Sequence, residues 1–355
     1  MRSTNGSAPV RGRGASHNPT NRFAALAVVR DGWRDCEDPA PRTELLADGA
    51  RSIVSHNDSP DVGFDTSVNP YRGCEHGCIY CYARPYHEYL GFSAGLDFET
   101  KILVKQDAPS LLRATLDSPR WQPQTILLSG VTDPYQPAER RICLTRSCLE
   151  VLAEYRNPVA ITTKNYLITR DADLLGQLAA RSAAAVSFSI TTLDEELARR
   201  SEPRASSPSR RLGAIRRLTE KGIPVGVNVA PVIPGLTEHE LPRILAAAAS
   251  AGASYAAYIL LRLPHVVSRL FETWLEQYYP DRQDRVLNRI RETRGGKMYD
   301  SRFEVRHSGE GEYARHIADI FRIGCRKAGL SARYPKLSTA AFRRRPRATQ
   351  LRLFD

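Results

Sequence analysis

The sequence has no run of about 18 apolar residues, the length that a membrane-spanning helix needs. Residues 1–20 also lack the apolar core of a secretory signal peptide. Cysteine is scarce, with seven residues in 355, and these show no spacing typical of a disulfide framework. These absences argue against a membrane protein and against a secreted one. We therefore expect reduced thiols and a cytoplasmic location.

Three of the seven cysteines lie within eight residues, at Cys74, Cys78 and Cys81. Thiolates this close on one loop can reach a common metal centre, but they are one fewer than the four ligands of a structural zinc site. They suit a [4Fe–4S] cluster in which cysteine binds three irons and the fourth iron stays open. Gly73 and Gly77 allow the backbone to wrap around such a cluster, because glycine accepts positive φ.

The residues around these cysteines leave other interpretations open. His76 or His87 would complete a zinc loop, and a redox-inert group of cysteines is a further alternative. Tyr80 puts an aromatic ring beside the last cysteine, where it would cover one edge of a cluster. We favour the iron–sulfur interpretation, because the full spacing with its flanking glycines is more specific than a lone C-x-x-C pair.

The C-x₃-C-x-aromatic-C pattern from Cys74 to Cys81 resembles the signature of the radical S-adenosylmethionine (radical SAM) enzymes. In that family the open iron chelates the amino and carboxylate groups of SAM, and reductive cleavage releases a 5′-deoxyadenosyl radical. The resemblance implies that this chain binds a [4Fe–4S] cluster and SAM. It also implies an electron donor such as flavodoxin or ferredoxin.

Apolar runs rich in β-branched residues alternate with amphipathic stretches from residue 66 to residue 278. Strands are expected near residues 68–72, 124–128, 158–163, 185–190, 224–229 and 254–260. The alternation predicts an α/β fold with a parallel sheet, and a doubly wound sheet fits it as well as a barrel does. In radical SAM proteins the loop that carries the cysteines also follows the first strand, as the loop of residues 73–81 does here (the cluster loop). This resemblance implies their partial (β/α)₆ barrel of the TIM type.

The chain divides into four segments. We expect a disordered or loosely packed basic segment over 1–50, the barrel over 51–275, a helical extension over 276–330 and a flexible basic tail over 331–355. Within the barrel, Ser207 and Pro208 are expected to begin one helix. Thr237 and Glu240 are expected to form a capping box for another helix.

Polar residues follow several strands, and in a barrel they would meet at one mouth. After the second strand, Ser129, Thr132 and Asp133 offer acceptors for an amino group, and the alternative is a turn stabilised by Asp133. This loop is similar to that of the spore photoproduct lyase branch. The resemblance implies that the loop binds the methionyl amine, that Lys164 holds the methionyl carboxylate and that Ser189 reaches the ribose. The alternative for Lys164 and Ser189 is a solvated position at a strand end.

The sequence departs from that lyase at one point. The lyase uses a hydrogen-donor cysteine just after its second strand, where this chain has Gly130 and Val131. The nearest cysteine, Cys143, lies 13 residues beyond Gly130. This departure argues against thymine-dimer repair by the route of that lyase.

The net charge of +12 belongs to the two ends of the chain. Residues 1–35 hold six Arg and two Asp, giving +4, and residues 326–355 hold seven Arg, two Lys and one Asp, giving +8. The 290 residues between them are therefore neutral overall. Basic ends indicate attraction to a polyanion, nucleic acid first, and a merely solubilising tail is the alternative.

The last residues resemble the peptide by which bacterial DNA polymerases and repair proteins bind the sliding clamp. Leu353 and Phe354 would fill an apolar pocket while Gln350 hydrogen-bonds at its rim; alternatively Leu351, Leu353 and Phe354 pack back on the barrel. The favoured function is a radical SAM enzyme that acts on DNA. The alternatives are the same chemistry on RNA or protein, and a zinc-stabilised nucleic-acid-binding protein without catalysis.

Overall fold

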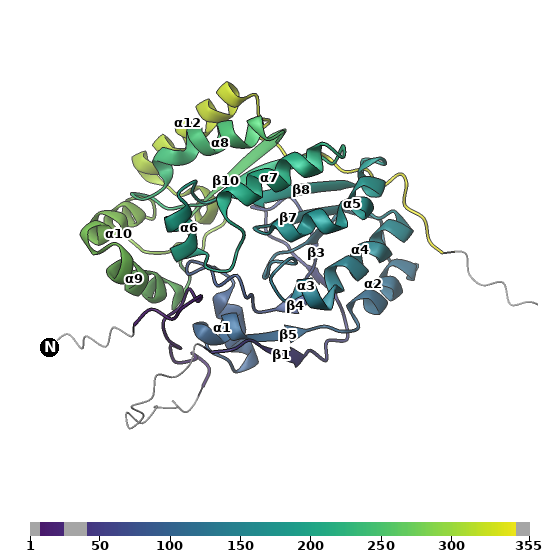
Figure 1. The fold of residues 1–355 in the computed structure, drawn as a ribbon, viewed down its shortest axis with the longest axis horizontal. Coiled ribbons are helices and arrows are strands. Elements are labelled where there is room, and N and C mark those ends of the chain that lie inside the picture. Colours follow the sequence, from purple (N-terminus) through teal and green to yellow (C-terminus); the bar gives the residue numbers. More distant parts are fainter. Residues whose placement is uncertain (1–7, 25–40, 346–355) are drawn as a thin grey trace, which may run out of the picture.

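The computed structural model describes residues 8–24 and 41–345, which are organised around a seven-stranded sheet (Figure 1). The sheet has the order β10-β9-β8-β7-β6-β3-β2, and all neighbours are parallel except β2 and β3. Its strands are β2 (Val54–His56), β3 (Thr66–Val68), β6 (Ile126–Leu128), β7 (Val159–Thr163), β8 (Ala184–Ser189), β9 (Val225–Val232) and β10 (Tyr255–Leu260).

The strand order decides between the two architectures that the alternation allowed. A doubly wound sheet reverses its order at a switch point. Here the six parallel strands neighbour one another in the order of the sequence, as strands of a (β/α) barrel do. In the described part of the chain β2 and β10 are the two edges, so the sheet is open. Five of the six expected strands are present, with ends that shift by a few residues, whereas the strand expected at 68–72 is divided between β3 and a short strand, Tyr71–Arg72, of a second sheet.

Helices connect the parallel strands and cover the outer face of the sheet (Figure 1). All six residues of β8 are buried. Helices cover the outer face of this strand, and its other face points into the concave interior of the curved sheet. The connecting helices are α2 (Ala108–Asp117), α3 (Glu139–Ile142), α4 (Leu144–Tyr155), η2 (Tyr166–Asp171), α5 (Ala172–Ala179), α6 (Glu195–Ser201), α7 (Pro208–Thr219), η3 (Glu238–Glu240) and α8 (Leu241–Ser250).

One of the two expected helix caps is present. At Ser207 the hydroxyl accepts a hydrogen bond from the amide three residues later, at 3.4 Å. The prediction of a capping box formed by Thr237 and Glu240 is wrong, because the Thr237 side chain accepts no hydrogen bond at the start of the helix. The Thr237 hydroxyl instead accepts from the Ile233 amide at 2.9 Å, and the Glu240 carboxylate accepts from the Leu193 amide at 2.8 Å. Contacts distant in sequence have replaced the local cap.

A second, three-stranded sheet carries the cluster loop, and the sequence did not indicate it. Its order is β1-β5-β4, with β1 (Glu44–Ala47) parallel and β4 (Tyr71–Arg72) antiparallel to β5 (Lys101–Val104). The short helices η1 (Arg84–Leu90) and α1 (Leu96–Thr100) lie between β4 and β5 in the chain. β4 ends one residue before Gly73, so this sheet fixes the start of the loop.

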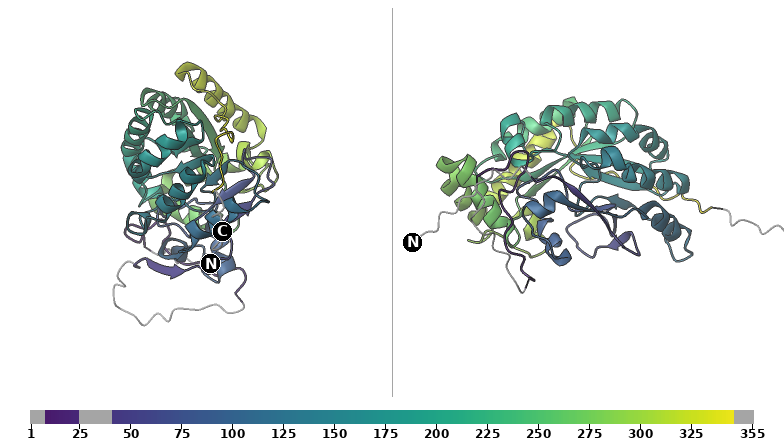
Figure 2. Two further views of the ribbon diagram at one scale, coloured as in Figure 1. Left: turned by 90° about the vertical axis from the view of Figure 1, so that its right-hand side faces the viewer. Right: turned by 60° about the horizontal axis from the view of Figure 1, so that its bottom comes forward.

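The prediction of a disordered or loosely packed segment is wrong for residues 8–24 and for β1. Ala15 is 1% exposed, and the amides of Gly14 and Ala15 donate to the Glu99 carboxylate at 2.9 and 2.8 Å. The Leu96 amide donates to the His17 carbonyl at 3.3 Å. Figures 1 and 2 show the dark-purple segment beside α1. It packs there because it satisfies a buried carboxylate, which composition does not reveal.

The expected helical extension contains α9 (Val267–Tyr278), η4 (Pro280–Arg282), α10 (Gln283–Glu292), α11 (Val305–Ser308) and α12 (Gly311–Ala328). α9 and α10 form a second core together with Ile79 and Tyr80 of the cluster loop. α12 packs on α8, on the outer side of the sheet (Figure 1). Among the described residues, no helix combines the length and apolar character that a bilayer span requires.

The prediction of a flexible tail is wrong for residues 331–345. The Ser338 amide donates to the Ser182 carbonyl at 2.8 Å, and the Arg343 amide donates to the Tyr155 carbonyl at 2.9 Å. In Figure 1 this yellow segment runs past α5. Its backbone amides donate to carbonyls at the end of α4 and just after α5. The basic composition of the segment gives no information about these hydrogen bonds, so it did not predict where the segment lies. The clamp-like residues Gln350, Leu351, Leu353 and Phe354 lie outside the described residues.

Candidate active site

The three cysteines of the motif lie on one loop that begins after β4. Cys74 and Cys78 are each 7% exposed, and Cys81 is half-buried. The loop turns at Gly77, whose φ of +68° favours glycine, and a Cβ there would lie 2.6 Å from a Glu99 carboxylate oxygen. The sequence therefore gives three thiols on one tightly wound, largely buried loop.

Contacts of the loop place it at the carboxyl-terminal ends of the parallel strands. His76 Nδ1 lies 3.3 Å from the carboxylate of Asp133, which follows β6, and His76 Nε2 lies 3.0 Å from the Asn165 amide nitrogen, which follows β7. The Tyr80 hydroxyl lies 3.1 Å from the Thr191 hydroxyl, which follows β8. In barrels of this type, chemistry takes place at this end of the strands.

A buried ion pair anchors the loop from its outer side. The Arg84 guanidinium lies 2.5 Å from the Glu99 carboxylate, and both side chains are fully buried. Arg84 also donates to the carbonyls of Cys78 at 3.0 Å and Gly77 at 3.2 Å. The remaining capacity of Glu99 is used by the Gly14 amide and its neighbour, so the N-terminal segment and the cluster loop share one carboxylate.

Gly14 is expected to tolerate no side chain. A Cβ there would lie 1.8 Å from the Gly77 carbonyl oxygen, so Gly14→Ala must push the N-terminal segment away from the cluster loop. We expect a loss of about 1–3 kcal/mol in the free energy of unfolding, measured with urea. In reconstituted protein we also expect faster bleaching of visible absorption in air. Gly49→Ala is the control, because a Cβ there meets nothing within 4 Å; equal stability of the two variants would contradict this contact.

The donor set of the loop fits an iron–sulfur cluster. Burial and the Glu202 carboxylate raise the pKa of the Cys78 thiol well above its usual value, and burial and Cys74 raise that of Cys81 to about 11. Thiolates in such surroundings need neighbouring cations, which iron supplies. Within residues 8–24 and 41–345, no three Cys, His, Asp or Glu side chains gather closely enough for one metal ion. A cubane does not require this, because each thiol binds a different iron.

His76 has partners for its ring, and although Nε2 of the buried His87 has none among the described residues, neither histidine forms with the cysteines a group placed to hold a single zinc ion. Both ring nitrogens of His76 have partners, Asp133 and Asn165. Burial would lower the pKa of His76, but the charges of Asp133 and Cys74 and hydrogen bonds to both raise it to about 10. His87 lies against the Phe98 ring at a centroid distance of 5.6 Å, and burial lowers its pKa to about 4.

The loop after β6 holds the cluster loop through a backbone carbonyl. The Thr132 hydroxyl and the Gln136 amide both donate to the Gly73 carbonyl, at 2.7 and 3.2 Å. Gln136 also accepts from the Glu75 amide at 2.9 Å. The Ser129 hydroxyl donates to the Thr132 carbonyl at 3.3 Å. Thr132 is thus occupied in positioning the loop, and Gln136 is a positioning residue that the sequence did not single out.

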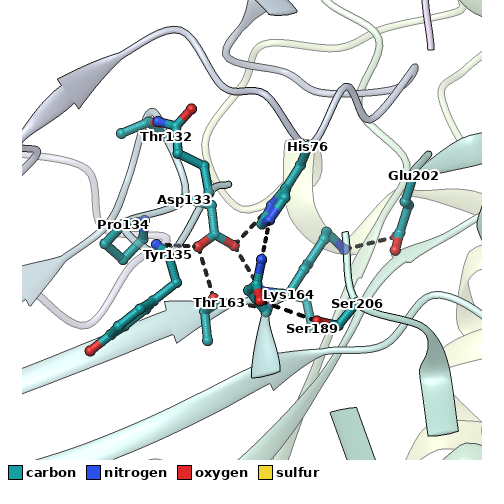
Figure 3. A network of polar contacts seen from close by, with 12 residues as sticks. His76, Thr132, Asp133, Pro134, Tyr135, Thr163, Lys164, Ser189, Glu202 and Ser206 are labelled. Carbon is teal, nitrogen blue, oxygen red and sulfur yellow. Dashed lines mark hydrogen bonds and ion pairs between the residues drawn. The ribbon is translucent and has the colours of Figure 1, made fainter. Parts of the chain in front are cut away.

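Asp133 joins three loops at the mouth (Figure 3). One carboxylate oxygen accepts from the Tyr135 amide and the Thr163 hydroxyl, each at 2.8 Å. The other accepts from the Lys164 amide at 2.7 Å and lies 3.3 Å from His76. Burial would raise the pKa of Asp133, but His76 and these hydrogen bonds lower it. Both oxygens of this carboxylate are used by the protein itself.

Lys164 belongs to a buried network of charges. Its ammonium lies 3.0 Å from the Glu202 carboxylate and 3.1 Å from the Ala230 carbonyl, and Figure 3 shows the contact with Glu202. Glu202 also accepts from the Tyr80 hydroxyl and forms an ion pair with Arg211. Burial would raise the pKa of Glu202, but Arg211, Lys164 and the hydrogen bonds lower it overall. One carboxylate therefore contacts two cations beside the cluster loop.

The sequence singled out neither Glu202 nor Arg211. Arg211 lies on the apolar face of α7 with Ile215 and Leu218, at the i, i+4, i+7 spacing, and all three are buried. An arginine at such a position indicates a buried cation that needs an acidic partner. Nothing comparable marks Glu202, which caps the end of α6.

The structure brings only part of the predicted set together. Ser189 ends β8 at 7% exposure, and its carbonyl accepts from Arg211 at 2.8 Å. Arg211 and Glu202 therefore connect Ser189 with Tyr80 and Lys164 in one region. Asp133 joins this region through the Lys164 amide, whereas the hydroxyls of Ser129 and Thr132 bond to backbone carbonyls of the two loops.

Cationic residues lie between the two edges of the open sheet. Arg262, which follows β10, stacks over the ring of Tyr82 at 4.9 Å and donates to His307 at 2.9 Å. Burial and Arg262 lower the pKa of His307 to about 4 and that of Arg294 to about 10. Tyr82 is the residue after the last cysteine and is 40% exposed. Arg262 thus lies against the residue that follows the last cysteine, whereas Arg294 is buried and donates to the carbonyls of Leu261 and Val305.

Arg262 and Arg294 lack carboxylate partners among the ion pairs of the described residues, whereas Arg306 beside them forms an ion pair with Asp61. Asp61 lies between β2 and β3, so this pair connects the loop at one sheet edge with α11 near the other. The open side is therefore bridged at one point.

Comparisons with known proteins agree with this geometry. The sequence profile of the radical SAM superfamily matches residues 68–248. An uncharacterised protein of Mycobacterium tuberculosis strain H37Rv is 38% identical over 251 residues, which cover 70% of this chain and 72% of that protein. An uncharacterised protein of Methanocaldococcus jannaschii is 28% identical over 248 residues, covering 70% and 88% of the two chains.

Among solved structures, spore photoproduct lyase complexed with a dinucleoside spore photoproduct has a TM-score of 0.59, at 19% identity and with 82% of each chain covered. A variant of that lyase with bound AdoMet and the same dinucleoside has a TM-score of 0.58, at 18% identity and with 82% of each chain covered. These likenesses concern the fold. Because the family profile covers half of the sequence and the fold agrees, the chain belongs to the radical SAM superfamily.

Proposed function

We propose that the protein is a radical SAM enzyme that acts on DNA. Cys74, Cys78 and Cys81 hold a [4Fe–4S] cluster whose fourth iron binds SAM. When bound, these cofactors supply a 5′-deoxyadenosyl radical through one-electron cleavage of a sulfur–carbon bond. The protein's own residues bind, orient and shield them. The observation that carries the proposal is the buried three-thiol loop over the carboxyl-terminal ends of six parallel strands.

Lys164 and Ser189 are the proposed SAM contacts. Lys164 is 14% exposed in its side chain and provides a point charge for the methionyl carboxylate. Its present partner Glu202 retains Arg211 if Lys164 turns toward SAM, so that carboxylate stays balanced. Ser189 offers a hydroxyl to the ribose. Tyr80 shields one side of the cluster, since its ring is 5% exposed and lies 5.6 Å from the Lys164 ammonium.

The loop after β6 divides its predicted roles. Ser129 is the proposed contact for the methionyl amine, because the one hydrogen bond of its hydroxyl among the described residues goes to a carbonyl of its own loop at 3.3 Å. Thr132 and Asp133 are positioning residues, because their polar atoms are engaged by the cluster loop and by the end of β7.

DNA is the proposed substrate for two reasons. The ends of the chain hold the whole positive excess of the sequence. Arg262 adds a cation after the edge strand β10, over the ring of Tyr82 next to the cluster loop. A clamp-binding role for Gln350, Leu351, Leu353 and Phe354 would bring the enzyme to replicating DNA. Gly130 stands where the lyase has its donor cysteine, so the reaction differs from that of the lyase.

The test is detection of 5′-deoxyadenosine from anaerobically reconstituted full-length protein with SAM and dithionite. Parallel samples contain no nucleic acid, intact duplex DNA, ultraviolet-irradiated DNA, RNA or a peptide mixture. We expect damaged DNA to raise the yield by about tenfold or more over the sample without nucleic acid, because substrate binding is used to lower the barrier. A comparable rise with RNA or peptide alone would reassign the substrate, and no product in any sample would refute the enzymatic function.

A further inference from the structure

A hollow of about 400 Å³ opens beside the cluster loop, and arginine dominates its lining. Arg140 and Arg141 come from α3, Arg204 follows α6, and Arg210 lies in α7. No acidic residue of the described chain lines it. Arg204 forms an ion pair with Glu75 at 2.9 Å, whereas the other three arginines have no carboxylate partner in residues 8–24 and 41–345. Such uncompensated charge attracts an anionic partner.

The wall of the hollow touches the cluster loop. The Arg204 amide donates to the His76 carbonyl at 3.2 Å. Asn165, which also lines the hollow, lies 3.0 Å from His76 Nε2, and His76 follows Cys74 by two residues in the cluster loop, close enough for the charge of Cys74 to raise the pKa of His76. Asn165 and His76 therefore form a contiguous route of two side chains from the hollow to the first cluster ligand.

The hollow and the open side of the sheet are different places. Its arginines follow β6 and β8, and Asn165 follows β7, so the hollow lies over the middle strands of the sheet. Arg262 follows the edge strand β10, and Asp61 precedes β3 near the other edge. Because the sheet curves around the mouth, a partner in the hollow leaves the open side free for substrate.

The chemistry proposed above needs one electron for each cleavage of SAM. The described chain shows no second group of cysteines to relay it: Cys143, Cys148 and Cys325 are free thiols on α3–α4 and α12. The electron must therefore come from another molecule that approaches the cluster closely. We propose that the arginine hollow is the docking site of an acidic electron-donor protein of the flavodoxin or ferredoxin type. This inference rests on the proposed radical SAM function.

The transfer balances without a further reactant. With flavodoxin, an anionic flavin hydroquinone loses one electron and becomes the neutral semiquinone, while the cluster gains that electron, and no proton has to move. A nucleic-acid strand suits the hollow less well, because backbone phosphates are bound along an extended cationic track. Here the cations surround one concave spot, on segments that follow β6 and β8 rather than the edge strand β10.

The test is a binding titration of reconstituted full-length protein with purified flavodoxin, and separately with ferredoxin, at low ionic strength. Flavin fluorescence or absorbance reports binding, so the measurement does not depend on turnover. The variant Arg140→Glu with Arg141→Glu is expected to bind at least about tenfold more weakly than the wild type, and added salt should weaken wild-type binding. Arg140→Gln with Arg141→Gln is expected to give an intermediate affinity, and it covers the case in which charge reversal disturbs α3.

The matched control is Arg315→Glu with Arg322→Glu on α12, which makes the same change in net charge at side chains that are 76% and 65% exposed. It should bind within about twofold of the wild type. Equal weakening in both pairs, unchanged affinity of the α3 variants, or no binding of either donor to the wild type would overturn the proposal. A matching loss of duplex-DNA affinity in the α3 variants would assign the hollow to nucleic acid instead. Dithionite-driven 5′-deoxyadenosine from the wild type tests the underlying function separately.

Discussion

Cys78→Ser is expected to reduce formation of 5′-deoxyadenosine by about 10³-fold or more. Removing a residue that only hydrogen-bonds to a metal ligand typically lowers metal affinity or activity by about 10–100-fold, and this change removes a proposed ligand itself. Serine keeps the size of the side chain but replaces the thiolate that iron prefers. The Cys78 side chain is 7% exposed, so water cannot readily take its place. The measurement is product per chain after anaerobic reconstitution, with dithionite as reductant, and with iron content determined in the same samples.

Cys143→Ser is the control for Cys78→Ser. Cys143 lies between α3 and α4, outside the cluster loop, and is half-buried. Among the described residues its thiol contacts the Arg170 guanidinium at 3.4 Å and the Arg140 carbonyl at 4.0 Å. Its replacement should leave iron content and product formation within about twofold of the wild type, as distant surface changes do. Full iron content in Cys78→Ser, or an equal loss in both variants, would contradict the assignment of the cluster ligands.

Glu202→Ala is expected to lower the free energy of unfolding by about 3–5 kcal/mol, because it leaves a buried arginine without its counter-charge. Glu202 and Arg211 are each 1% exposed in their side chains, and Lys164 is 14% exposed. Removing the carboxylate also takes away a partner of the Tyr80 hydroxyl. Urea unfolding of wild type and variant at equal iron content measures the effect.

Two further variants separate burial from simple loss of an ion pair. Glu196→Ala removes the partner of Arg200, but its side chain is 55% exposed, so we expect a loss below about 1 kcal/mol. Glu202→Ala combined with Arg211→Ala should cost less than the sum of the two single changes, since neither charge remains unpaired. Similar losses in Glu196→Ala and Glu202→Ala would show that the buried network adds nothing beyond a surface pair.

The sequence predicted the main sheet well because its strands carry their own pattern. Runs such as 158–163 and 185–190 are apolar, β-branched and bounded by helical stretches, so their local chemistry and their tertiary role agree. That the three cysteines share one loop was equally predictable, since they lie within eight residues. In both cases the information is contiguous along the chain.

What the sequence did not predict depends on contacts distant in sequence. β1 has the residues Glu-Leu-Leu-Ala, with little strand propensity, and exists because it pairs with β5. The N-terminal segment packs because Glu99 accepts its amides, 85 residues away. Asp133 was expected to contact SAM, yet both its oxygens bind the protein. The sequence shows that position 133 is an aspartate, but it does not show which hydrogen-bond donors the fold places around that carboxylate.

We propose that Cys74, Cys78 and Cys81 hold a cluster with one iron open to SAM. Electron paramagnetic resonance of the reconstituted, dithionite-reduced protein tests this most directly, with iron and sulfide determined on the same sample and spectra recorded with and without SAM. For a [4Fe–4S] cluster with one open iron, we expect about four irons and four sulfides per chain and a spectrum that changes when SAM is added. A colourless protein with one zinc per chain, or a spectrum indifferent to SAM, would contradict it.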